Sequence, residues 1–168
     1  MKNQHIIIVS LLLILLLLCI QTSAGNPREI VTSYSNLKAV DIETIEGDCI
    51  FKSTPGNVIT VQVTYEYTPD SFEPELKEIG DVLYIREKFA ESCSGYSRWI
   101  ITAPEDTRIQ FKSWTGDIEI DGFSGVIHGK TSSGHLDVKN CRGNFQVNND
   151  PGVVDMLLKW ILRKLIGD

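Results

Sequence analysis

The sequence is poor in positive charge, and it lacks several motifs that mark enzymes. Its 168 residues include 16 lysines and arginines against 22 aspartates and glutamates, so the formal net charge is −6. Such a chain offers no broad basic surface for phosphate backbones, which disfavours a nucleic-acid-binding role. The sequence has no Gly-x-Ser-x-Gly elbow, no phosphate-cradling loop and no cysteine–histidine dyad that can be placed. We therefore expect no cofactor and no catalytic residues.

Long apolar runs are also scarce, with one exception at the start of the chain. Ile6 to Ile20 is apolar except for Ser10, follows Lys2 and precedes the small residues Thr22, Ser23 and Ala24. This run is shorter than the roughly 20 residues that a membrane-spanning helix needs. Its flanks are typical of a secretory signal peptide over residues 1–24. The sequence thus predicts an exported protein in the periplasm, on the cell surface or outside the cell.

Cysteine is rare too, and its spacing limits what it can do. No two of the four cysteines have the two-to-four-residue spacing of a zinc knuckle, so we predict no metal site. Three of them, Cys49, Cys93 and Cys141, follow the predicted leader, which allows at most one internal disulfide. We predict a Cys49–Cys93 bond, because the loop around Cys93 can reach back to the strand that carries Cys49. Lipid attachment to Cys19 is an alternative reading of the leader, although Leu18 stands where a small residue is usual.

Side chains after the leader alternate between apolar and polar, which predicts strands rather than helices. Three segments show this period of two, namely 57–67, 82–88 and 97–103. Residues 68–80 hold two prolines and several acids, and they predict a loop. No helix signal is found before residue 150.

The most specific signal is an internal repeat of 18 residues between Ile109 and Asn149. The repeat aligns Gly116 with Gly134 and Gly125 with Gly143, and it aligns apolar positions with one another. Such a coil cannot bury its apolar face alone and must stack on its neighbours. We therefore predict an all-β fold, a short parallel β-helix or solenoid with 18-residue coils over residues 25–152. Four apolar side chains are expected to stack inside it: Ile118, Ile120, Leu136 and Val138. Residues 44–51 carry the same Gly-Asp turn and predict a first, divergent coil.

Three turns carry a resemblance to a known family. Gly47-Asp48, Thr115-Gly116-Asp117-Ile118 and Thr131-Ser132-Ser133-Gly134, with Ala103-Pro104 just before the repeat, resemble the bacterial putative adhesin family. The resemblance covers roughly Val40 to Gly152. It implies a short β-solenoid on an exported protein, with surface adhesion as the function class, and it supplies no catalytic or binding residues.

Stacking at 18 residues places Asp117 beside His135, Asp121 beside Lys139, and Gln110 beside His128. Carboxylates on adjacent rungs are most simply an exposed polar ladder. The alternative is a carbohydrate-active enzyme on a β-helix that uses the surface carboxylates Asp117, Glu119 or Asp137. Exposed aromatic rings can also stack on sugars or proteins. The candidate binding residues are Trp114, His128 and His135.

Residues 153–168 break the pattern, since ten of the sixteen are apolar and Asp155, Lys159 and Arg163 recur every four. This spacing predicts a C-terminal amphipathic helix. Three readings stay open: the helix caps the last rung, it lies on a membrane surface, or the reading frame is disrupted there. An uncapped rung would leave a strand edge open to end-to-end self-association. Together these patterns predict a non-enzymatic adhesin or scaffold whose partner is a surface protein or a glycan.

Overall fold

The alternating segments of the sequence form strands, as expected from their period of two. The computed structural model describes residues 26–90 and 93–149, and within them the chain has no helix. The first six strands are β1 (Arg28–Ser35), β2 (Ala39–Thr44), β3 (Asp48–Ser53), β4 (Val58–Glu66), β5 (Phe72–Ile79) and β6 (Val82–Phe89). The next six are β7 (Tyr96–Ala103), β8 (Arg108–Ser113), β9 (Ile118–Asp121), β10 (Val126–Thr131), β11 (Leu136–Lys139) and β12 (Asn144–Asn149). The all-β prediction is confirmed for the described residues.

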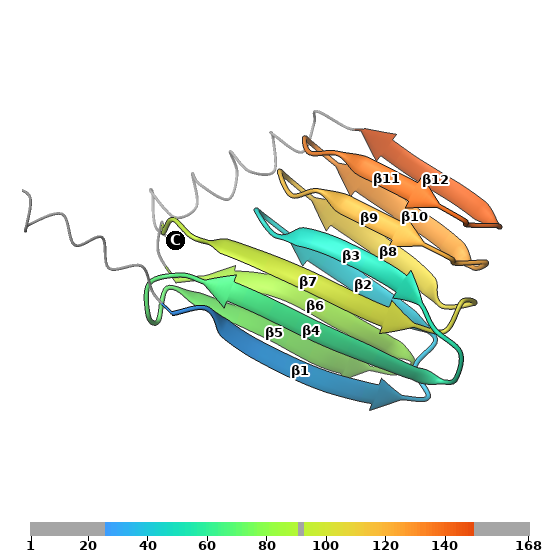
Figure 1. Ribbon diagram of the computed structural model, residues 1–168, viewed down its shortest axis with the longest axis horizontal. Coiled ribbons are helices and arrows are strands. Elements are labelled where there is room, and N and C mark those ends of the chain that lie inside the picture. Colours follow the sequence, from blue (N-terminus) through green and yellow to red (C-terminus); the bar gives the residue numbers. More distant parts are fainter. Residues whose placement is uncertain (1–25, 91–92, 150–168) are drawn as a thin grey trace, which may run out of the picture.

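The strands make two six-stranded sheets that lie face to face (Figure 1). Sheet A has the order β1-β4-β7-β3-β9-β11, and sheet B has the order β12-β10-β8-β2-β6-β5. Pairs in sheet A are antiparallel between β1, β4 and β7 and parallel from β7 to β11. In sheet B only the β5–β6 pair is antiparallel. Both sheets are therefore mixed.

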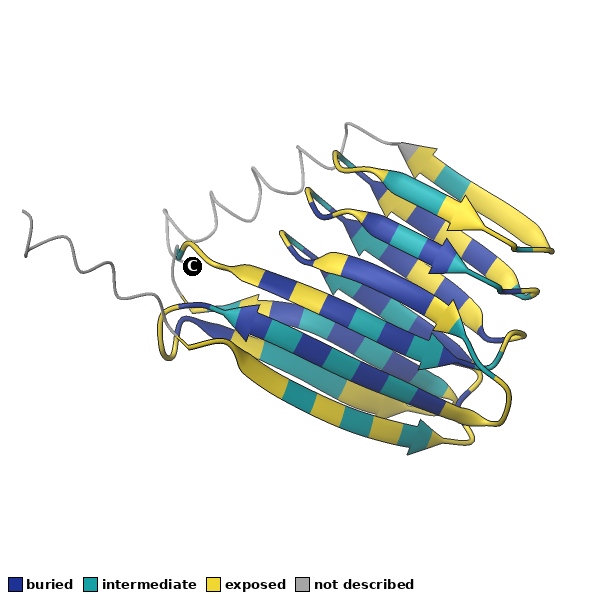
Figure 2. Ribbon diagram, in the orientation of Figure 1, coloured by how far each residue is buried: buried dark blue, intermediate teal, exposed yellow. Residues whose placement is uncertain are grey.

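The core fills the space between the two sheets. Inward side chains alternate with outward ones along the strands, so each central strand reads as a striped ribbon in Figure 2. The largest buried side chains include Trp99 and Phe51 from sheet A and Phe111 from sheet B. This alternation is what a sheet with one face on the core and one in solvent requires.

The 18-residue spacing sets the register of the last coils. Ile118 pairs with Leu136 in sheet A, and Ile127 pairs with Phe145 in sheet B, each across a parallel ladder. Residues 44–51, predicted as a first coil, lie across the end of β2 and most of β3, which pair in parallel with β8 and β9. We call β2, β3 and β8 to β12 the stacked half of the molecule, and β1 and β4 to β7 the antiparallel half.

Glycines in the turns of the stacked half are required by close backbone approach. A Cβ on Gly116 would overlap the carbonyl oxygen of Gly47 in the turn below it, and a Cβ on Gly134 would meet the Gly116 carbonyl. Gly134 also has a φ of 101°, a conformation that other residues rarely adopt. Gly116 does not have a positive φ, so glycine is required at this position only because a larger side chain would not fit.

The predicted closed β-solenoid is wrong. Strands β4 to β7 are inserted between the first coil and the second, and they include antiparallel pairs that a solenoid does not contain. The physical reason is that β5 and β6 pair with one another as an antiparallel hairpin, while β4 pairs antiparallel with β1 and β7. The repeat therefore builds one half of a two-sheet sandwich rather than the whole fold.

Two finer expectations also need correction. Residues 68–80, predicted as a loop, contain the edge strand β5, in which Pro74 is tolerated because an edge strand need not donate every amide. Ile118 and Ile120 are buried as predicted, whereas Leu136 is half-buried and Val138 is 39% exposed. Both of the latter lie on β11, the last strand of sheet A, which has a neighbour on one side only within the part of the chain that the structure describes.

Several predictions concern the ends of the chain and lie outside the described residues. These are the signal peptide over residues 1–24, lipid attachment at Cys19 and the amphipathic helix over residues 153–168. The described residues hold no helical segment with the length and hydrophobicity that a bilayer crossing requires.

Candidate functional site

The three residues predicted to bind a ligand lie in different places. His128 is on the outer face of β10, with Gln110 of β8 and Gln146 of β12 as its neighbours across the ladder. Trp114 is half-buried in the turn after β8, where its amide donates to the Thr44 carbonyl at 3.3 Å. His135 is exposed in the turn before β11. The structure therefore does not gather the three into one site.

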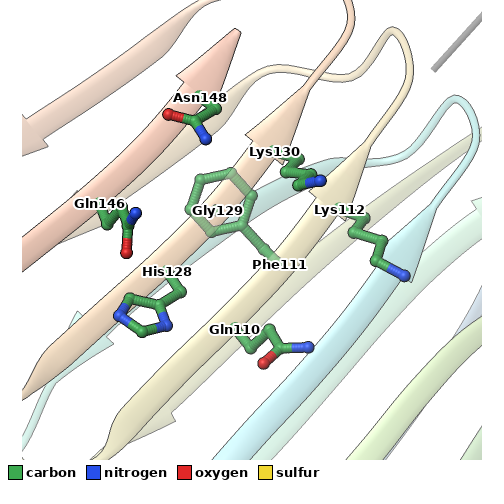
Figure 3. A pocket seen from close by; sticks show the side chains of 8 residues that line it. All are labelled: Gln110, Phe111, Lys112, His128, Gly129, Lys130, Gln146 and Asn148. Carbon is green, nitrogen blue, oxygen red and sulfur yellow. The ribbon is translucent and has the colours of Figure 1, made fainter. Parts of the chain in front are cut away.

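His128 instead belongs to a depression over three strands of sheet B. Figure 3 shows two rows of side chains that cross β8, β10 and β12, with the histidine in one row and two lysines in the other. The depression has a volume of about 270 Å³. We call it the basic groove, and its outward side chains are Gln110, Lys112, His128, Lys130, Gln146 and Asn148.

Regular strand pairing fixes the geometry of the basic groove. Gln110, His128 and Gln146 are register partners, and so are Lys112, Lys130 and Asn148. On the core side, the ring of Phe111 fills the space that a side chain at Gly129 would occupy. A site on paired strands is held more rigidly than a site on loops.

The basic groove has a local charge opposite to that of the whole chain. Strands β8, β10 and β12 carry Arg108, Lys112 and Lys130 and no aspartate or glutamate. The Lys112 ammonium lies 4.0 Å from Glu43, whereas Lys130 makes no ion pair within residues 26–90 and 93–149. The groove thus offers positive charge in a protein that is acidic overall.

Acidic side chains next to the basic groove are already neutralised. On β2, Asp41 accepts hydrogen bonds from Arg86 at 2.9 Å and from Gln110 at 3.1 Å. Arg86 also lies 3.4 Å from Glu43. These pairs leave Lys130, His128, Gln146 and Asn148, at the far end of sheet B, without side-chain partners in the described part of the chain.

Asp117, a candidate catalytic carboxylate, has a structural role in the turns. Its Oδ1 accepts a hydrogen bond from the His135 amide at 2.7 Å. Its own amide donates to Asp48 Oδ1 at 2.9 Å, one coil below. Each aspartate thus ties its turn to the next, which explains the Gly-Asp pairs of the repeat without any catalytic function.

Glu119 and Asp137 are register partners on the outer face of sheet A, as the repeat predicted. Lys139 lies between them, with its Nζ 2.6 Å from Asp137 and 3.7 Å from Glu119. The hydrogen bond to Asp137 raises the pKa of Lys139, so its ammonium stays charged. A pair of carboxylates shared by one ammonium on an open strand surface forms no cleft around a glycosidic bond.

Two other depressions lie between the loops at one end of the sandwich. One, of about 600 Å³, is lined by residues 53–56 and 104–106. The other, of about 660 Å³, lies between residues 36–38, 56–57 and the chain around Arg108 and Gly125. Loop residues line most of both, so their shape is held less firmly than that of the basic groove.

The predicted Cys49–Cys93 disulfide is not present, and both thiols are free. Cys49 is buried, with its Sγ facing Thr44 Oγ1 and the Gly47 carbonyl. Burial, together with the negative charge of Glu87, raises the pKa of the Cys49 thiol. Cys93 is half-buried and its Sγ lies 3.8 Å from the Ser71 carbonyl. Within the described residues no three His, Cys, Asp or Glu side chains cluster to hold a metal ion.

Sequence reasoning missed Glu87, a buried carboxylate that joins the two halves of the molecule. Its Oε2 accepts hydrogen bonds from the amides of Ile45 at 2.6 Å and Glu46 at 3.3 Å. Its Oε1 accepts from the Ser97 hydroxyl and from the indole nitrogen of Trp99 at 3.0 Å. The only sequence signal was its place at an inward position of β6, where an apolar residue is expected.

Comparison with known proteins finds likeness at the level of fold. No protein-family model matches the chain, and no curated protein matches it. A putative cell adhesion protein from Clostridium sporogenes ATCC 15579 has a similar structure, with a TM-score of 0.50 and 16% identity over 73% of this chain and 68% of that one. A putative adhesin from Bacteroides fragilis NCTC 9343 has a TM-score of 0.38 and 20% identity, over 71% of this chain and 61% of that one.

Proposed function

We propose that this chain is an exported, non-enzymatic adhesin or scaffold that holds an acidic glycan in the basic groove. The observation that carries the proposal is that Lys130, Gln146 and Asn148, which lie around His128, have no side-chain partner in the described chain. Polar groups on a rigid surface that are not used inside the protein are free to bind a ligand. The Clostridium sporogenes structure, described as a cell adhesion protein, supports the same class of function by its fold.

The chemistry of the basic groove favours a glycan with carboxylates. Gln146 and Asn148 offer amides that donate to and accept from sugar hydroxyls, and Gln110, whose amide nitrogen bonds to Asp41, offers its carbonyl oxygen. Lys112 and Lys130 lie side by side on neighbouring strands and can each pair with a carboxylate of successive sugars. The groove crosses the strands, so an extended polymer can meet several rungs in turn (Figure 3).

Titration calorimetry with polygalacturonate, a polymer whose sugars carry carboxylates, tests the proposal, with neutral dextran as the comparison ligand. Replacing both lysines (Lys112→Gln with Lys130→Gln) removes two exposed ion pairs of about 0.7 kcal/mol each, so we expect roughly tenfold weaker binding. Added salt should weaken binding of the unaltered chain, because exposed charges are screened.

A matched control removes the same amount of charge elsewhere. Lys52 on β3 and Lys77 on β5 are exposed lysines on other strands. The pair Lys52→Gln and Lys77→Gln should leave the affinity for polygalacturonate within about twofold, since neither residue lies in the groove. Equal losses in the two double variants would contradict a binding site in the basic groove.

The alternative, a carbohydrate-active enzyme that uses Asp117, Glu119 or Asp137, predicts turnover rather than binding alone. Its test is the release of new reducing ends from polygalacturonate by the unaltered chain. Release that disappears in the variant with Asp117→Ala and Asp137→Ala, while the far-ultraviolet circular dichroism is unchanged, would overturn the non-enzymatic proposal. We expect no release, because these carboxylates bind turn amides and Lys139.

Export is the remaining part of the proposed function, and the apolar start of the sequence supports it. Fractionation of the producing cells, followed by intact mass measurement, tests it. A chain that begins at Gly25 in the exported fraction is the expected result. Recovery of the uncleaved chain from the cytoplasm would contradict export. An added mass that matches a lipid on Cys19 would indicate that the exported chain is attached to a membrane.

A further inference from the structure

Within residues 26–90 and 93–149, both sheets finish at the same end of the sandwich with an edge strand (Figure 1). Sheet A ends with β11 and sheet B ends with β12, and among these residues each pairs with a neighbour on one side only. We call these two strands the open end. Backbone donors and acceptors along such edges are a template for pairing with another chain.

The open end also exposes the last apolar side chains of the core. Val138 of β11 and Phe145 of β12 are each 39% exposed. Leu136 and Val147, which face the same interior, are half-buried against the core. In the coil below, the register partner of Val138 is Ile120, which is fully buried. One more layer of strands at this end would bury all four side chains.

The charges on β11 are arranged so that the strand complements itself. Asp137 and Lys139 flank Val138 and lie on the outer face, as their register partners Glu119 and Asp121 do. If two copies of β11 run antiparallel with Val138 opposite Val138, each Asp137 lies opposite the Lys139 of the other copy. Opposite charges directly across an antiparallel pair stabilise it.

Strand β12 offers no obstacle to the same arrangement. It reads Asn-Phe-Gln-Val-Asn-Asn and has no charged residue and no proline. Two copies brought together therefore meet no like-charge repulsion along this edge. The outward amides of Asn144, Gln146 and Asn148 can bond to amides of the same kind.

We propose that the open end pairs with the open end of a second copy, with β11 antiparallel to β11 about a two-fold axis at Val138. The interface is isologous, because the same surface is used on both subunits. The two six-stranded sheets become two twelve-stranded sheets, and Leu136, Val138, Phe145 and Val147 of both copies share one core. The dimer rests on the edges of β11 and β12, whereas the glycan proposal rests on the outward side chains of sheet B, and Gln146 and Asn148 of β12 lie at the border of the two surfaces.

The test is a charge swap followed by sedimentation velocity over a range of concentrations of the full exported chain. Asp137→Lys alone places lysine opposite lysine twice, so we expect at least a tenfold increase in the dimer dissociation constant. The single variant Lys139→Asp places aspartate opposite aspartate and should increase the dimer dissociation constant to a similar extent. The combined variant, Asp137→Lys with Lys139→Asp, restores opposite charges across the axis and should restore the dimer.

The matched control is Glu75→Lys, which breaks the exposed Lys88–Glu75 pair on β5 and β6 at the other end of sheet B. It should leave the dissociation constant unchanged. Failure of the combined variant to restore the dimer would overturn the register at Val138. Circular dichroism of each variant separates loss of pairing from loss of the fold.

A second measurement keeps the proposal falsifiable if the charge variants do not fold. In a chain with Cys93→Ser and Cys141→Ser, Val138→Cys should form an intermolecular disulfide on oxidation, whereas Val126→Cys on β10 should not. A monomer at every concentration with slow hydrogen exchange in β11 and β12 would overturn the proposal. That result would show that another part of the same chain, residues 150–168, covers the open end.

Discussion

The two edges of sheet B end in opposite ways. Strand β5, at the edge of the antiparallel half, carries Pro74 and four charged residues, and its Glu75 pairs with Lys88 of β6 at 2.7 Å. Strand β12, at the edge of the stacked half, carries no charge and no proline. Proline and charge protect an edge from pairing with other chains. Among the described residues, sheet B is thus protected at its β5 edge and not at its β12 edge.

The interiors of the two halves differ in the same sense. The antiparallel half is closed by an aromatic cluster of Tyr65, Tyr67, Phe72 and Phe89, whose contacting rings have centroids 4.4 to 5.4 Å apart. In the stacked half the apolar column becomes exposed in the last coil: Phe51 and Ile120 are fully buried, and Val138 is 39% exposed. Hairpins supply their own partners, whereas a parallel coil depends on the coil that follows it. The difference agrees with the proposal that a second copy pairs with the stacked half.

The largest effect that distinguishes the halves is expected from glycine substitution. Gly116→Ala forces a Cβ against the Gly47 carbonyl in the stacked half, which should cost at least about 3 kcal/mol of unfolding free energy. Gly56→Ala, in a loop with open space around it and a φ of 114°, should cost only about 1–2 kcal/mol. Urea denaturation of both variants measures the difference. Equal losses would mean that the stacked turns can separate freely.

The contact between the halves is tested at Glu87. Glu87→Ala leaves the amide of Ile45, the Ser97 hydroxyl and the Trp99 indole without their buried acceptor. We expect a loss of about 3 kcal/mol in unfolding free energy. Glu87→Gln, which keeps one acceptor oxygen, should lose less. A loss below about 1 kcal/mol for the alanine variant would mean that the two halves are held together mainly by apolar packing.

A smaller effect is expected from the difference in burial between adjacent coils of the stacked half. Ile118 and Leu136 are register partners in adjacent coils, the first buried and the second half-buried. Ile118→Ala should cost about 2–5 kcal/mol, and Leu136→Ala roughly half as much because it is partly solvated already. Thermal and urea unfolding at low protein concentration check the ratio. Equal losses would show that Leu136 is covered in solution, which would remove the contrast between the two ends.

The repeat of the sequence predicted the local structure of the stacked half well. Spacing alone placed Gln110 beside His128 and Asp121 beside Lys139, and both pairs are present in the ladders. A repeat of this kind fixes register because one rung lies directly on the next. The same information could not show that β4 to β7 interrupt the coils. Antiparallel pairing between strands far apart in the sequence depends on which strands meet in the fold, and no fixed sequence period indicates it.

The candidate site was predictable only in part. His128 was singled out from its outward position, but the lysines beside it were not, because a single lysine on a strand is ordinary. Lys112 and Lys130 stand out because the nearest acids, Asp41 and Glu43, lie on β2 and are paired to Arg86. Only the order of the strands in the sheet reveals this arrangement. Glu87 was missed for the same reason, since its four donors come from segments 10 to 42 residues away.

The cysteines give the last and smallest comparison, because their thiols differ in burial. Cys49 is buried and its thiol pKa is raised, while Cys93 in the antiparallel half and Cys141 near the open end are half-buried. Thiolate is the reactive form, so iodoacetamide should modify Cys93 and Cys141 at least about tenfold faster than Cys49 in the folded chain. Peptide mass mapping of a time course measures the three rates, and the denatured chain, in which all three should react alike, is the control. A disulfide-linked Cys49–Cys93 peptide would show that the turn around Gly47 opens far enough to release Cys49, and the tight contact between the two halves at Glu87 would then have to be looser than the folded structure shows.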